Sequence, residues 1–193
     1  NIGSNYGSMN VAASSNTPGS RCTYARWTDS QGIFWLFAGH VMSSTFNDIW
    51  KYDVSTNLWT WAGGGNGTNN AGNYGNSCEA NNYFPSTRTE SLCTWKDSCD
   101  RLWFVGGNNN TILNAANSDV WFFDPAVNQF TLVGGSAAIN TPGNYGTMTV
   151  ASPTNYPPSS CGSVGWTDSN GNFWLFGGLL DPAGDNKIGR AHV

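Results

Sequence analysis

The chain has 193 residues, of which only 10% are charged and 14% are aromatic, and it contains 24 glycines. Helical proteins rarely have this composition, because glycine marks turns while aromatic and β-branched residues favour half-buried strands. The formal net charge of −4, with no cluster of lysine or arginine, argues against nucleic acid as a partner. No stretch of about 18 apolar residues is present to span a membrane. The composition therefore predicts an all-β protein of many short strands.

The first predicted unit, residues 21–61, contains four strands. The turn from Asp29 to Gly32 separates the first two, because aspartate bonds its own backbone and glycine accepts a positive φ. The second strand is apolar without alternation, as expected of a strand that is covered on both faces. It ends at Ala38 and Gly39, where small residues let the chain turn. The expected strands are 23–27, 33–37, 49–54 and 58–61.

The sequence of this unit returns twice. A pair of tryptophans with a spacing of eight, first found at Trp27 and Trp35, occurs in each copy, and the aspartate after the first tryptophan recurs at intervals of 68 and 71 residues. Such self-similarity indicates a repeat architecture, because one unit cannot cover its own apolar face and needs stacked neighbours. The repeated positions are Trp27, Trp35, Gly39, Trp50, Tyr52, Trp59, Trp95, Trp103, Gly106, Gly107, Trp121, Trp166, Trp174, Gly177 and Gly178.

The repeated pattern resembles the kelch repeat: four apolar residues and a double glycine are followed by a separated tyrosine and tryptophan. The chain is similar to long-repeat kelch proteins and to the central domain of galactose oxidase, and the resemblance covers residues 1–186. It implies blades of a β-propeller at 21–61 and 88–132, and two strands of a third blade at 159–178. We therefore expect about two and a half four-stranded blades of a larger ring, whose remaining blades are further partners. The departures from the family pattern are Ala38, Asp100 and Ser160.

The two ends of the chain differ from the repeated part. Residues 1–20 are expected to be the connector from a preceding blade. Residues 187–193 resemble a translated sequencing adapter, so we expect them to be an artefact rather than natural sequence. On that expectation, His40 is the only natural histidine.

The recurring aspartates are expected to be structural. Asp29, Asp97 and Asp168 stand at equivalent hairpin turns, which favours backbone capping over catalysis. Asp48 and Asp119 begin the third strand of their units, and we expect them to cap the backbone in the same way.

No catalytic constellation is visible in the sequence. With His40 alone, neither a serine–histidine–acid triad nor a cysteine–histidine pair with its third partner can be assembled. Arg21, Arg26 and Arg88 lie in or before the innermost strands, where we expect internal pairing with glutamate or backbone carbonyls. We predict no cofactor and no metal site.

The loops between the units, together with the connectors after each double glycine at 40–46 and 108–117, supply the candidates for ligand binding. Tyr6, Tyr74 and Tyr145 occupy equivalent positions in a repeated Asn-Tyr-Gly segment, and His40 follows the first glycine pair. Loops held by a rigid scaffold often form binding surfaces. The alternative is that the three tyrosines pack over the blade edges and that His40 is an idle exposed side chain.

The cysteines and the glycosylation sequons leave several alternatives open. The chain has no cysteine pair at the spacing of a zinc or thioredoxin-like site, and both disulfides and buried reduced thiols fit the sequence. The sequons at Asn66 and Asn109 fall in predicted loops, where an acceptor is reachable. The five cysteines are Cys22, Cys78, Cys93, Cys99 and Cys161.

The sequence favours a non-catalytic binding module that is secreted or at the cell surface and recognises protein or carbohydrate. The first alternative is a fragment of a galactose-oxidase-like copper enzyme, whose site would need further histidines and a tyrosine-linked cysteine. The second alternative is a structural or adhesion repeat of an extracellular matrix.

Overall fold

The computed structural model of the chain describes residues 3–79, 82–90, 92–109, 115–180 and 187–188. This part consists of β-strands joined by turns and loops, so the prediction of an all-β protein is confirmed. Within these ranges no helix is long and apolar enough to cross a membrane.

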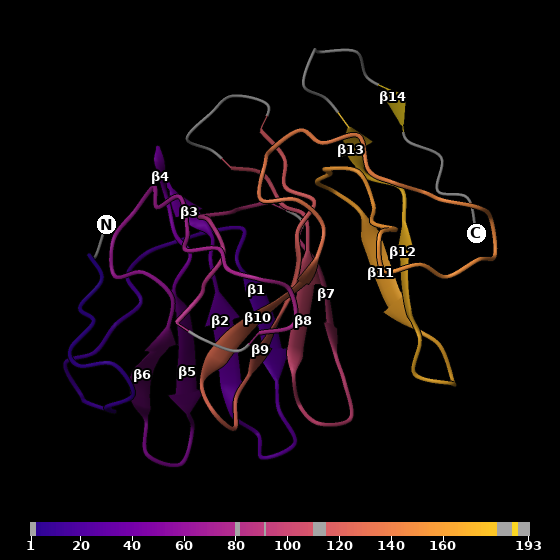
Figure 1. The fold of residues 1–193 in the computed structure, drawn as a ribbon. Helices are drawn as coiled ribbons and strands as arrows, with labels where there is room; N and C mark the ends of the chain where they lie inside the picture. Colours follow the sequence, from indigo (N-terminus) through magenta and orange to yellow (C-terminus); the bar gives the residue numbers. More distant parts are fainter. Residues whose placement is uncertain (1–2, 80–81, 91, 110–114, 181–186, 189–193) are drawn as a thin grey trace.

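Four antiparallel strands form sheet 1, in the order β1-β2-β5-β6 (Figure 1). The β1–β2 hairpin places Trp27 opposite Trp35, and β2 then pairs with β5. Between them the chain forms a short hairpin, β3 and β4, in a segment that the sequence predicts to be a connecting loop. The bounds are β1 Ala25–Thr28, β2 Phe34–Phe37, β3 His40–Val41, β4 Ser44–Thr45, β5 Ile49–Asp53 and β6 Leu58–Gly63.

Sheet 2 repeats this topology with the strand order β10-β9-β8-β7, and sheet 3 contains β11 and β12 only. A two-residue ladder between β13 and β14 follows sheet 3. Of the expected adapter segment, residues 189–193 lie outside the described residues. The bounds are β7 Cys93–Lys96, β8 Leu102–Val105, β9 Val120–Asp124, β10 Gln129–Gly134, β11 Val164–Thr167, β12 Phe173–Phe176, β13 Leu179–Leu180 and β14 Lys187–Ile188.

In each unit, an aspartate closes the turn of the first hairpin. Asp29 Oδ1 accepts hydrogen bonds from the backbone N–H groups of Gln31 and Ile33, and Oδ2 accepts one of 2.8 Å from the indole of Trp35. Asp97 and Asp168 make the same contacts in sheets 2 and 3. The aspartate thus fixes both the turn and the orientation of the second tryptophan, which is the capping role that its recurrence predicts.

Two departures from the repeat pattern keep the backbone conformation of glycine. Ala38 adopts a φ of +63°, close to the +74° of Gly106 at the equivalent position. Asp100 adopts +61° where Gly32 has +80°. A side chain in this left-handed region costs about 1–2 kcal/mol, so the fold holds both residues there against their own preference.

The main core lies between sheets 1 and 2, which pack face to face. Phe37 and Ile49 of sheet 1 are fully buried against Leu102, Phe104 and Phe123 of sheet 2. The rings of Phe37 and Phe104 are 4.5 Å apart. Burial of each such side chain stabilises the fold by about 1.5–3 kcal/mol. The sequence pattern predicts a second strand that is covered on both faces. This holds for β8 of sheet 2, whereas β2 of sheet 1 is covered on one face and leaves Phe34 47% exposed on the other.

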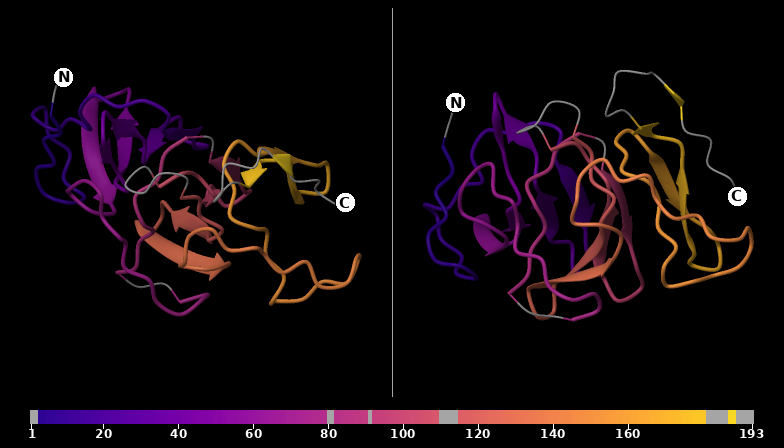
Figure 2. Two further views of the ribbon diagram at one scale, coloured as in Figure 1. Left: turned by 90° about the horizontal axis from the view of Figure 1, so that it is seen from above. Right: turned by 45° about the horizontal axis from the view of Figure 1, so that its top comes forward.

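A smaller core joins sheet 2 to sheet 3. Trp95 and Val105 of sheet 2 pack against Phe173 and Leu175 of sheet 3. Seen from above, the three groups of strands are set at angles to one another (Figure 2). Among the described residues, sheet 2 therefore packs against a sheet on each face, whereas sheets 1 and 3 each pack against sheet 2 alone.

One hydrogen bond recurs at both junctions. The indole Nε1 of Trp27 donates to the carbonyl oxygen of Trp95 at 3.1 Å, and Trp95 donates in turn to the carbonyl of Trp166 at 3.1 Å. Each unit is thus tied to the next through its first tryptophan, at equivalent positions of the repeat.

Candidate functional site

A buried charged network occupies the interior of sheet 2. The guanidinium of Arg88 forms two parallel bonds to the carboxylate of Asp119, at 2.9 and 2.7 Å, and both side chains are fully buried. The hydroxyl of Tyr74 and the indole of Trp121 each donate to the same carboxylate at 2.7 Å. Every carboxylate oxygen therefore has a protein donor, as a buried charge requires.

The electrostatics of this network follow from its geometry. Burial alone would raise the pKa of Asp119, but the charge and hydrogen bonds of Arg88 outweigh it and hold that pKa below its ordinary value. Burial, and then the negative charge of Asp119, raise the pKa of Tyr74. Both groups are therefore held in one protonation state, which suits a structural role.

Sheet 1 contains the same network at equivalent positions. Arg21 binds the carboxylate of Asp48 through both terminal nitrogens, and Tyr6 and Trp50 donate to its Oδ2 at 2.8 and 2.7 Å. The ring of Tyr6 also packs on Trp50, with ring centroids 5.2 Å apart. Burial and the charge of Asp48 raise the pKa of Tyr6.

These two networks correct several expectations. Asp48 and Asp119 bind side chains and do not cap the backbone. Arg21 and Arg88 do pair internally, but with aspartate and backbone carbonyls rather than with glutamate. Arg26 is exposed on sheet 1. Among the ligand candidates, Tyr6 and Tyr74 are committed to these contacts, as the packing alternative describes.

Tyr145, the third tyrosine candidate, lies in a different environment. Its side chain is 59% exposed and borders a shallow hollow together with Met148 and Val150. Ser160 stands at the position of Arg21 and Arg88 in this unit. The third unit therefore has the connector tyrosine without the ion pair.

Among the candidates for ligand binding, His40 lies in contact with other polar side chains at the end of the strands where the connectors begin. Its Nδ1 lies 2.9 Å from the hydroxyl of Thr23 and 2.7 Å from that of Thr89, which belongs to the next unit. The sulfur of Cys22 lies 3.6 Å from Nε2. Cys22, Thr23, His40 and Thr89 are called the connector-end cluster below.

The side chains of this cluster combine accessibility with a constrained backbone. Cys22 and Thr23 are exposed, His40 is half-buried and Thr89 is fully buried. Thr23 has a φ of +52°, Glu90 has +53° at the equivalent position, and Gly162 has +74°. A β-branched residue is a clear outlier in this region, and such backbone strain concentrates at functional sites.

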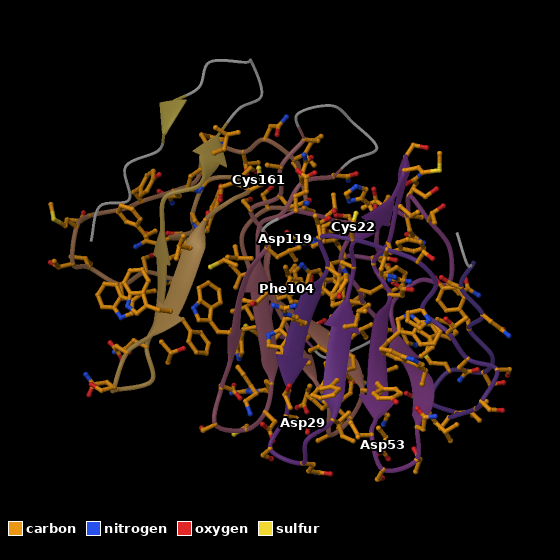
Figure 3. All side chains as sticks on the ribbon, turned by 180° about the vertical axis from the view of Figure 1, so that it is seen from behind. Cys22, Asp29, Asp53, Phe104, Asp119 and Cys161 are labelled. Carbon is orange, nitrogen blue, oxygen red and sulfur yellow. The ribbon has the colours of Figure 1, made fainter. Side chains whose placement is uncertain are left out.

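Figure 3 shows where the cluster lies relative to the turns. Cys22 and Cys161 lie at one end of the strands, whereas Asp29 and Asp53 lie at the other. At the turn end a hollow of about 480 Å³ is lined by Asp29, Asp53 and Asp100. Their carboxylates already accept hydrogen bonds from the adjoining turns. The connector end is the better candidate, because its groups come from two units and Cys22 and Thr23 are exposed there beside the half-buried His40.

The cysteines are free thiols in different environments. Cys22, Cys78 and Cys99 are exposed, and Cys161 is half-buried. Burial raises the pKa of the Cys93 thiol to about 11. The alternative of buried reduced thiols therefore describes Cys93 alone.

Metal donors do not assemble in the described residues. Cys22 and His40 are two potential donors in contact, but within the described ranges no group of three His, Cys, Asp or Glu side chains is placed to hold a metal ion. A copper site of the galactose oxidase kind needs a larger donor set than this pair supplies.

The two sequons differ in accessibility. Asn66 is exposed in the loop after β6. Asn109 is only 9% exposed, so the expectation of an accessible acceptor fails at this position. Its threonine, Thr111, lies outside the described residues.

Comparison with known proteins adds no family assignment. No protein-family profile matches the chain, and no curated protein sequence matches it.

Proposed function

We propose that this chain is part of a kelch-type β-propeller that serves as a non-catalytic binding module. Three features support the propeller. The four-stranded antiparallel sheet occurs twice with the same topology, consecutive sheets stack face to face, and the same tryptophan links each sheet to the next. Radial repetition of such sheets is the architecture of a propeller.

The proposed ligand surface is the connector end, and the cluster around His40 is the observation that carries it. Groups from two successive units, His40 and Thr89, meet there at 2.7 Å, next to the exposed Cys22 and Thr23. Binding sites on repeat proteins are commonly formed by loops of adjacent repeats on one face. Met42, at the tip of the β3–β4 hairpin, is 80% exposed and extends this surface.

The ligand class that we propose is protein or carbohydrate. A protein ligand fits the mixed character of the surface, because exposed methionine adapts to an apolar partner while the threonine and histidine supply hydrogen bonds. Sugars are usually held by stacking on exposed aromatic rings, but the tryptophans of this chain lie in the sheets. We therefore place protein first and carbohydrate second.

We further propose that the protein works outside the cell or at its surface. The accessible sequon at Asn66 supports this location.

The test is a binding screen of the full chain with matched variants. We expect a ligand from an extracellular protein library or a glycan array to bind the unaltered chain and to lose affinity roughly tenfold or more with His40→Ala or Met42→Asp. Val127→Asp is the control, because Val127 is 59% exposed in a turn between β9 and β10. Equal loss in all three variants, or no loss with the first two, would place the ligand elsewhere.

The oxidase alternative has one observation in its favour, the contact between Cys22 and His40. Copper analysis of the purified chain decides it, because bound copper that His40→Ala abolishes would replace the binding-module proposal. The structural or adhesion alternative predicts many more repeats than one ring holds, and the length of the full transcript decides it.

A further inference from the structure

The three turn aspartates differ in how many hydrogen bonds they accept. In each unit Oδ1 binds two backbone N–H groups of the turn, and Oδ2 binds the indole of the second tryptophan. In sheets 2 and 3 a side chain four residues further along adds a second bond to Oδ2. Arg101 Nε donates to Asp97 at 2.7 Å, and Asn172 Nδ2 donates to Asp168 at 2.9 Å. Both carboxylates are therefore saturated, since each oxygen accepts two bonds.

Sheet 1 has an apolar residue where the other units have this donor. Ile33 stands at the position of Arg101 and Asn172. Among the described residues, Oδ2 of Asp29 accepts one hydrogen bond, which comes from the indole of Trp35 at 2.8 Å. One acceptor position of a half-buried carboxylate thus stays open. A charged donor is the partner that such an oxygen binds most strongly.

The open position borders a hollow of about 480 Å³ between sheets 1 and 2. Asp29, Ile33, Trp35 and Asp53 line it from sheet 1, and Pro125 lines it from sheet 2. Sheets 1 and 2 pack against each other beside it, so both of its walls belong to the described residues. Further units of a larger ring would stack on the outer faces of sheets 1 and 3 and would leave this hollow open.

The charges that line the hollow are unequal. Lys96 binds Asp100 at 2.7 Å and neutralises that carboxylate. The carboxylates of Asp29 and Asp53 then share one cation among the described lining residues, the ammonium of Lys51. The hollow therefore carries an excess of negative charge, which attracts a cationic ligand.

Sheet 2 shows which cation fits such a place. There the guanidinium carbon of Arg101 lies 5.7 Å from the ring centroid of Trp103 and 5.0 Å from that of Phe122, while Nε bonds to the turn aspartate. In sheet 1, Trp35 is the equivalent of that tryptophan, and the Lys51 ammonium lies 5.9 Å from its ring centroid. A guanidinium suits this arrangement better than an ammonium, because its flat face stacks on a ring while its edge donates to a carboxylate.

We propose that the hollow between sheets 1 and 2 binds an arginine side chain that a protein partner presents. The guanidinium donates to the open position of Asp29 and lies against Trp35, and Asp53 accepts from its remaining N–H groups. The stem of the arginine packs on Ile33. The volume of the hollow is that of a small-molecule site, so residues that flank the arginine also find room.

This site is separate from the connector end. Asp29 and Asp53 lie at the opposite end of the strands from Cys22 (Figure 3). The inference rests on the contacts of sheets 1 and 2, so it holds whether or not a ligand binds the connector-end cluster.

The test is a titration of the full nitrogen-15-labelled chain with a blocked tripeptide that carries arginine between two glycines. The reporter is the indole N–H signal of Trp35, because its acceptor gains a second donor. We expect saturable shifts with a Kd of about 1 mM or tighter. The same peptide with citrulline, which has the shape of arginine without its charge, should not shift the signal. The lysine peptide should bind roughly fivefold more weakly or worse.

Two arginine substitutions locate the binding. Ile33→Arg supplies the guanidinium from within the chain, so it should move the Trp35 signal without peptide and weaken peptide binding about tenfold or more. Met148→Arg is the matched control, because Met148 is 69% exposed beside a different hollow, and it should bind the peptide like the unaltered chain. Asp53→Asn replaces Ile33→Arg if circular dichroism shows that the latter is unfolded, and it should weaken binding about threefold.

Several results would overturn the proposal. One is a Trp35 signal that stays unmoved at about 20 mM arginine peptide. Another is an equal response to the citrulline or the lysine peptide, which would show that no guanidinium is recognised. The last is peptide binding that Ile33→Arg leaves intact, or that Met148→Arg weakens to the same extent.

Discussion

Replacement of Arg88 by methionine tests how the buried network stabilises sheet 2. The substitution keeps an unbranched apolar stem but removes both bonds to Asp119, at 2.9 and 2.7 Å, and leaves that carboxylate with Tyr74 and Trp121 as donors. Both partners are fully buried, so no solvent replaces the lost charge. Breaking a buried pair in this way costs about 3–5 kcal/mol of unfolding free energy.

The sign of the pH dependence follows from the pKa of Asp119. In the unaltered protein that pKa lies below the ordinary value, so its contribution to stability is present above the unfolded pKa and is lost as the pH falls through the folded one. Without Arg88, burial raises the pKa instead. The variant therefore gains relative stability as the pH falls, and its deficit near pH 7 should exceed its deficit near pH 5.

Urea denaturation followed by tryptophan fluorescence measures both quantities, at one fixed protein concentration. The double variant Arg88→Met with Asp119→Asn is the control, because the neutral amide no longer buries a charge. We expect it to be more stable than Arg88→Met alone. A loss below about 1 kcal/mol for Arg88→Met, or a deficit independent of pH, would refute the reasoning.

Three further predictions concern single positions. Gly135→Ala should destabilise the fold far more than Gly171→Ala, although both glycines have a φ of +82°. A Cβ at position 135 would collide with the carbonyl oxygen of Ser118, whereas a Cβ at position 171 meets open space. Equal shifts in the denaturation midpoint of the two variants would contradict this. Alkylation of the native protein near pH 8 should modify the exposed Cys22, Cys78 and Cys99. Cys93 should stay unmodified, because burial raises the pKa of its thiol to about 11. Rapid modification of Cys93, detected by mass spectrometry, would disprove this prediction. Asp168→Ala should release the indole of Trp174 and speed the amide hydrogen exchange of the β11–β12 hairpin. Asp124→Ala should not change that exchange, because Asp124 accepts a hydrogen bond only within its own turn. NMR measurement of amide exchange in the two variants compares them.

The strands and turns were predictable because they depend on local sequence. The aspartate turns and the apolar second strands follow from residues within one unit, and Ala38 shows that a departure from glycine does not alter the turn. The β3–β4 hairpin was missed because two-residue strands carry no periodicity. Its first residue, His40, also pairs with Cys22 in an isolated backbone bridge, which joins residues 18 positions apart.

The ion-pair networks were only partly predictable. Tyrosine, arginine and aspartate recur together in both complete units, as Tyr74, Arg88 and Asp119 in the second. This joint recurrence was the sequence signal that the three side chains interact. The capping interpretation failed because spacing along the chain does not show that Asp119 points into the sheet interior. The connector-end cluster could not be predicted, because His40 and Thr89 meet only when two sheets stack.

Indole hydrogen exchange tests the stacked-repeat account most directly. Sheets joined through Trp27 and Trp95 require those indole N–H groups to be protected by the carbonyls that accept them, whereas Trp166 should exchange freely. The measurement uses a nitrogen-15 correlation spectrum of the chain. Slow exchange at Trp27 and Trp95 with fast exchange at Trp166 is the predicted result. Exchange of Trp27 and Trp95 as fast as that of Trp166 would contradict the stacking of the sheets.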